Sequence, residues 1–88
     1  MGWTIEYSPG AARAIRKLDR AQARRILDYM DARIAGSENP RQFGHALVGS
    51  RAGYWRYRVG DHRVICQLVD QRLVVMVVEI GHRREVYR

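Results

Sequence analysis

The sequence predicts an α+β domain: an N-terminal strand, then a two-helix hairpin, then an antiparallel three-stranded meander. Two observations carry this prediction. Apolar residues recur at helical spacing between residues 11 and 34, and strand-like apolar runs fill much of the stretch from residue 54 to residue 80. Helices gathered before a run of strands are typical of domains whose helices cover one face of an antiparallel sheet.

The first strand and both helices carry their own end signals. Residues 3–7 alternate apolar and polar side chains, as a half-buried strand does. Ser8 can cap a helix that has Pro9 at its first position. Asp19, with Gln22 three residues later, has the spacing of a capping box. The apolar stripes of the two helices are Ala11, Ala14, Ile15 and Leu18, and then Ala23, Ile26, Leu27, Met30 and Ile34.

Gly36 is a plausible end for the second helix, and a loop-like segment follows over residues 37–53. Within it, residues 45–47 are either a short strand or an anchor of the loop. The meander then has two tight turns, Gly60-Asp61 and Asp70-Gln71, and Gly81 is expected to end its last strand. The three predicted strands are residues 54–59, 62–69 and 73–80. The last is apolar on both faces, which favours a central position in the sheet.

A two-residue turn fixes which residues of the first hairpin face each other. Val59 then opposes His62, and Arg58 opposes Arg63. Because side chains alternate along a strand, Arg56 also lies on the face of Arg58 and Arg63. The other face is predicted to be the core side, formed by Trp55, Tyr57, Val59, Val64, Cys66 and Leu68.

Three arginines on one sheet face indicate a phosphate site. Like charges directly opposite each other destabilise a sheet, whereas the planar guanidinium donates hydrogen bonds well to a phosphate. The alternative is that Arg56, Arg58 and Arg63 simply extend into solvent. The prediction also depends on register, because a bulge at the turn would move Arg63 to the other face.

Composition agrees with a nucleic-acid partner. The chain has 88 residues, enough for one domain (1–88), and 16 Lys and Arg against 9 Asp and Glu, a net charge of +7. A basic surface is expected of nucleic-acid binders, with acidic proteins and anionic membranes as rival partners. The single cysteine, Cys66, excludes an internal disulfide and is expected to be an inert core residue. With no secretory signal pattern and no apolar run long enough for a bilayer, we expect a soluble cytoplasmic protein.

Other basic and aromatic side chains extend the candidate surface. Arginines and a lysine on the outer helix faces either line a path for an RNA backbone or are ordinary solvated charges; they include Arg13, Lys17, Arg20 and Arg24. In the tail, Arg83 or Arg84 can swing over the arginine face, and Tyr87 either stacks on a base or anchors the tail. His45, His62 and His82 are scattered and have no metal-ligand spacing, so we expect neither a metal nor another cofactor.

The chain resembles the RelE family of bacterial toxin–antitoxin systems over nearly its whole length. The resemblance rests on the first strand, the two basic helices, the segment Leu47-Val48-Gly49, and the hairpin strands YWRYRV and HRVI. Its most specific part is the closing segment IGHRREVY, residues 80–87. The resemblance implies a RelE-like sheet with helices on one face and a toxin that cuts messenger RNA on the ribosome.

The resemblance also implies the roles of particular residues. Its functional positions fall on Arg56, Arg58, Arg63, Arg83 and Tyr87. The RNA's own 2′-hydroxyl would attack the adjacent phosphate. Arg63 would clamp that phosphate, Arg83 would stabilise or protonate the leaving oxygen, and Tyr87 would orient a base. The implied partners are the ribosome and mRNA, operator DNA only through the antitoxin, and an acidic RelB-like antitoxin that wraps around the toxin.

One departure from the family concerns the general base. Relatives have lysines where this chain has Arg56 and Arg58, and arginine, unlike lysine, does not lose its proton in proteins. Another group would have to accept the proton, and His82 is a candidate; otherwise the site relies on charge stabilisation alone. Two further readings are a ParE-type inhibitor that binds DNA gyrase without cutting RNA, and an inactive toxin that acts only as a co-repressor with its antitoxin.

Overall fold

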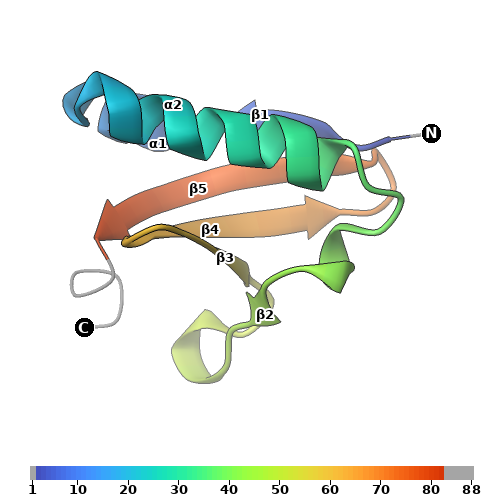
Figure 1. Cartoon of the computed structure of the whole chain (residues 1–88). Helices are drawn as coiled ribbons and strands as arrows, with labels where there is room; N and C mark the ends of the chain where they lie inside the picture. Colours follow the sequence, from blue (N-terminus) through green and yellow to red (C-terminus); the bar gives the residue numbers. More distant parts are fainter. Residues whose placement is uncertain (1, 83–88) are drawn as a thin grey trace.

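The computed structural model describes residues 2–82, in which helices lie on one face of a five-stranded sheet (Figure 1). The strands are β1 (Thr4–Tyr7), β2 (His45–Ala46), β3 (Trp55–Val59), β4 (His62–Val69) and β5 (Val74–His82). The helical elements are α1 (Pro9–Lys17), α2 (Arg20–Tyr29), the π-helical η1 (Met30–Ala35), and the 3-10 helices η2 (Pro40–Gln42) and η3 (Gly49–Arg51). The predicted α+β class is confirmed.

The strand order is β1-β5-β4-β3-β2. The predicted meander forms the antiparallel part, β5-β4-β3, and the short β2 continues it. The first strand, β1, pairs in parallel with the last, β5, which makes the sheet mixed. The apolar run of β5 thus occupies an inner position with strands on both sides, as its sequence predicted.

Both predicted helix caps form. The Ser8 side chain accepts a hydrogen bond from the backbone N–H of Ala11 at 3.1 Å, and Asp19 accepts one from that of Gln22 at 2.9 Å. The second helix continues beyond Tyr29 as the π-helical η1, and Gly36 caps its end as predicted. The π-helical winding was not expected from the sequence.

The first hairpin has the predicted register. Val59 pairs with His62, Arg58 with Arg63, and Tyr57 with Val64. Gly60 has a φ of 61°, in the left-handed region that glycine adopts without the clash a Cβ would cause. A two-residue loop with this conformation joins the strands without a bulge, so the predicted face of Arg63 is correct.

Both ends of β5 differ from prediction, and β1 and β3 each begin one residue later than predicted, at Thr4 and Trp55. The second turn is longer than Asp70-Gln71: Leu73 donates its N–H to the carbonyl of Asp70 and has a positive φ of 53°, so β5 starts at Val74. Gly81 does not end β5, because it pairs with Arg63, and the strand continues to His82. A glycine in a strand weakens it locally but does not prevent pairing.

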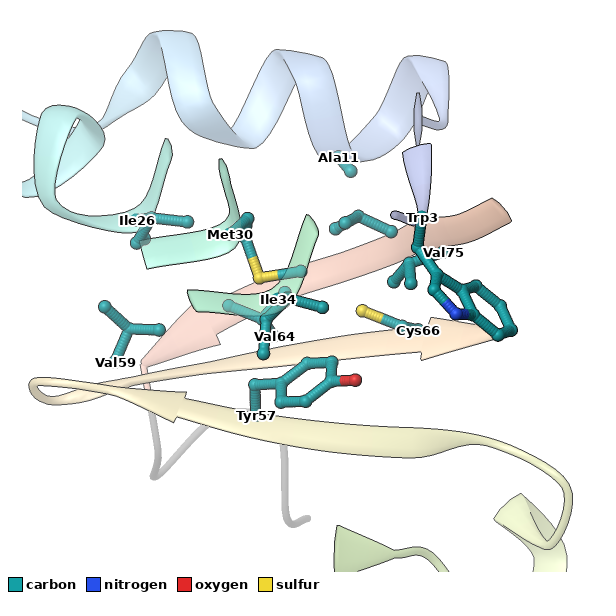
Figure 2. Close-up of a cluster of buried hydrophobic side chains, with 11 residues drawn as sticks. Trp3, Ala11, Ile26, Met30, Ile34, Tyr57, Val59, Val64, Cys66 and Val75 are labelled. Atoms are coloured by element: carbon teal, nitrogen blue, oxygen red, sulfur yellow. The ribbon is translucent and has the colours of Figure 1, made fainter. Parts of the chain in front are cut away.

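The core lies between the helices and the sheet (Figure 2). Ile26, Met30 and Ile34, from α2 and η1, face the sheet side chains and are fully buried. The sheet contributes mainly Tyr57, Val59, Val64, Cys66, Val75 and Val77. The predicted core side of the hairpin is therefore the helix-covered face.

We expect Cys66 to resist thiol reagents in the folded protein. Its side chain is fully buried, and burial raises the pKa of its thiol, so little nucleophilic thiolate forms. Titration with Ellman's reagent should detect almost no reactive thiol in the native protein and one thiol per chain after denaturant is added. Rapid labelling of the native protein would contradict this placement.

Candidate functional site

Arg56, Arg58 and Arg63 share the sheet face turned away from α1 and α2, which we call the outer face. Arg58 and Arg63 are direct cross-strand partners, and Arg56 lies two residues from Arg58 on β3. Their neighbours in sequence, Tyr57 and Val64, point into the core instead. The strand alternation thus brings three predicted site residues onto one surface.

The three arginines differ in exposure. Arg58 is exposed and Arg56 is partly buried, whereas Arg63 is only 9% exposed. The cluster is therefore less open than the exposed patch that the sequence suggested. A guanidinium in a partly water-excluded position interacts more strongly with an anion than one in bulk water.

The outer face also carries two charged residues that sequence reasoning missed. Glu79 of β5 pairs with Ile65, and Ile65 pairs with Arg56, so the three lie in one row across the sheet. Arg51 of η3 donates a hydrogen bond to Glu79 Oε1 at 2.5 Å. A carboxylate and a fourth arginine therefore adjoin the cluster.

The connection that carries η3 is anchored at its start. Arg41 donates two hydrogen bonds to the Asp70 carboxylate, at 2.8 and 3.0 Å, and thereby ties η2 to the β4–β5 turn. These hydrogen bonds lower the pKa of Asp70. The Tyr57 hydroxyl donates to the carbonyl of Pro40 at 2.8 Å, which fixes η2 to β3 from the core side.

The helix cations do not reach the outer face. Arg13, Lys17, Arg20 and Arg24 are all exposed, but α1 and α2 lie across the sheet from the arginine cluster (Figure 1). These four side chains therefore do not share a face of the sheet with Arg56, Arg58 and Arg63.

His82 was a candidate to accept the proton beside the three arginines, but it lies on the opposite side of the sheet. It pairs with His62, which pairs with Val59 of the core, so its Cβ projects toward the helix-covered side. The rings of His62 and His82 stand edge to face, with centroids 6.0 Å apart. The register thus separates His82 from the three arginines.

The other predicted tail residues, Arg83, Arg84 and Tyr87, lie outside the described residues. Within residues 2–82, no three side chains of His, Cys, Asp or Glu gather as metal ligands do. No helix in that range has the length and apolar character needed to cross a membrane.

Comparison with known proteins places this fold in a family. Residues 5–87 match the family model described as "ParE toxin of type II toxin-antitoxin system, parDE". Toxin RelG of Mycobacterium tuberculosis is 24% identical over 88 residues, covering 100% of this chain and 99% of the relative.

Solved structures agree. The toxin–antitoxin complex RelBE2 of M. tuberculosis contains a chain that superimposes with a TM-score of 0.85 at 20% identity, covering 94% of this chain and 93% of that one. A mutant of Escherichia coli toxin RelE, in complex with a peptide of antitoxin RelB, gives a TM-score of 0.71 at 21% identity, with coverages of 99% and 92%. The family model spans nearly the whole chain, and the fold agrees with these solved structures. The chain therefore belongs to the ParE toxin family of type II toxin–antitoxin systems, and it has the fold of the RelE toxins.

Proposed function

We propose that the toxin is a ribosome-dependent endoribonuclease that cuts messenger RNA. The observation that carries the proposal is the convergence of Arg56, Arg58 and Arg63 on the outer face. Their guanidiniums offer planar sets of hydrogen-bond donors from neighbouring positions on one face, and such donors suit a phosphodiester. In the proposed reaction the 2′-hydroxyl attacks the adjacent phosphorus, and the products are a 2′,3′-cyclic phosphate and a 5′-hydroxyl.

The arginines would act mainly by electrostatic stabilisation. Charge develops on the phosphoryl oxygens as the attacking oxygen approaches, and donors already held in place need not reorganise. Arg63, on an inner strand of the sheet, is the most buried of the three. Arg83 and Tyr87 are proposed to complete the set by stabilising the leaving oxygen and stacking on a base.

The proposed partners follow from the relatives. Solved relatives include toxins in complex with RelB antitoxins, and we propose a RelB-like antitoxin for this chain. We propose that RNA also contacts the protein away from the cleavage site, through the exposed helix residues Arg13, Lys17, Arg20 and Arg24 and through His82 and Arg84. A single domain spanning 1–88 that works in the cytoplasm accords with these partners.

Gyrase inhibition is the second candidate, because the matching family model is that of ParE toxins. A gyrase inhibitor does not require a phosphate site on the sheet. The paired positions of Arg58 and Arg63 therefore favour cleavage over inhibition.

One experiment separates the two candidates. After brief induction of the toxin in cells, the 5′ ends of all messages are mapped, and DNA breaks are measured in parallel. We expect new 5′-hydroxyl ends within codons, which disappear when translation initiation is blocked beforehand. Intact messages together with an increase in DNA breaks would instead support gyrase inhibition and contradict message cleavage.

A further inference from the structure

We propose that Glu79 is the base that takes the proton from the attacking 2′-hydroxyl. This inference rests on the proposed nuclease function and supplies a group that the arginine cluster lacks. Arginine does not act as a base in proteins, and the register places His82 on the opposite side of the sheet. A carboxylate on the outer face can accept the proton.

A β-bulge puts Glu79 on that face. Along β4 and β5 the partners run Cys66 with Val77 and then Ile65 with Glu79, which leaves Val78 as the extra residue. Without the bulge, strict alternation would place Glu79 on the same side as Val77, in the core. Bulges that re-aim a side chain are concentrated next to active sites.

The bulge is held by the start of α1. The backbone N–H of Ser8 donates to the carbonyl of Val77 at 2.9 Å, and the Ser8 hydroxyl donates to that of Val78 at 3.3 Å. The same hydroxyl oxygen caps α1 by accepting from Ala11. The orientation of Glu79 therefore depends on the junction of β1 and α1, across the sheet from the site.

The register suits proton transfer beside a bound phosphate. Glu79 is diagonal to Arg63, since Arg63 pairs with Gly81 two residues further along β5. Diagonal neighbours on one sheet face lie about 7–8 Å apart, within reach of long side chains, so Arg63 and Glu79 can both contact one phosphate and its ribose. The 2′-oxygen lies next to the phosphorus, so a phosphate on Arg63 brings the hydroxyl toward Glu79.

The carboxylate is also accessible. The Glu79 side chain is 43% exposed, and Arg51 is its partner through Oε1. Among residues 2–82, no hydrogen bond to Oε2 is formed. Arg51 thus orients one oxygen and leaves the other able to accept a proton.

The step balances without an oxidant or a metal. Glu79 takes the proton as the 2′-oxygen bonds to phosphorus, the bond from phosphorus to the 5′-oxygen breaks, and that oxygen takes a proton from water. Glu79 then returns its proton to solvent. No oxidation state changes.

The test compares Glu79→Gln with Glu79→Asp in single-turnover cleavage of a message on programmed ribosomes, using purified full-length toxin. The glutamine keeps the size and an acceptor oxygen for Arg51 but is a negligible base. We expect it to cut about 10²–10⁴-fold more slowly than wild type, since general-base catalysis contributes a factor of this size. Glu79→Asp should recover part of that loss.

Arg51→Met separates a base from a mere ion-pair partner. It breaks the pair but keeps the carboxylate, so its rate should fall much less than that of Glu79→Gln. An equal fall in both variants would overturn the proposal, because only the ion pair would then matter.

An unchanged cleavage rate in Glu79→Gln would refute the proposal for Glu79 alone, whereas wild-type toxin that cuts no message would refute the nuclease function itself.

Discussion

Replacing Arg63 with alanine is expected to reduce message cleavage by about 10²–10³-fold, the usual effect of removing one preorganised donor from a developing oxyanion. Arg63 is the central member of the cluster: it faces Arg58 directly and Glu79 diagonally, and it is mostly buried. Cleavage on programmed ribosomes measures the effect directly, and growth inhibition on expression should be lost with it.

Two matched variants control this prediction. Arg72→Ala removes the same charge from the β4–β5 turn, where the side chain is 65% exposed, and should cut at the wild-type rate. Arg63→Lys keeps the charge without the planar fork of donors and should recover only part of the activity. If folded Arg63→Ala protein, checked by circular dichroism, cuts as fast as Arg72→Ala, the phosphate site is not on this face.

Replacing Tyr57 with alanine is expected to destabilise the protein by about 3–5 kcal/mol, the cost typical of truncating a large buried aromatic side chain. Tyr57 is fully buried, and its ring centroid lies 6.3 Å from that of Tyr29. Its hydroxyl donates a hydrogen bond to the carbonyl of Pro40. Burial raises the pKa of this hydroxyl, so it stays protonated and remains a donor. Chains of 88 residues have unfolding free energies of roughly 4–13 kcal/mol, so much of the stability would be lost.

Tyr57→Phe is the control, because it removes only the hydroxyl and should cost about 1 kcal/mol. Urea titrations of the three proteins followed by tryptophan fluorescence give the comparison. Because Tyr57 lies between Arg56 and Arg58 on β3, the alanine variant should also lose activity through unfolding of the site. Similar midpoints for the alanine and phenylalanine variants would show that the ring does not hold β3 in place.

The hairpin could be predicted because its register depends on local information. A two-residue turn containing Gly60 determines every pairing up to Trp55, so the shared face of Arg56, Arg58 and Arg63 followed from counting. The helix caps at Ser8 and Asp19 were equally local.

Glu79 could not be found in this way. Its face depends on a bulge that only the paired strands reveal, and no residue type marks Val78 as the extra one. Arg51 was missed because its partner is 28 residues away. The parallel pairing of β1 with β5 could not be predicted from local sequence patterns either, because it joins residues 4–7 to residues 74–77.

That first-to-last pairing has a consequence for biosynthesis. β1 precedes its partner strand along the chain, so residues 4–7 stay unpaired in the sheet until residues 74–77 have been synthesised. Contacts of such long range form late and slow folding. A nascent chain therefore cannot complete its sheet before β5 has been synthesised, so the sheet that carries Arg56, Arg58 and Arg63 is completed only after those residues have been made.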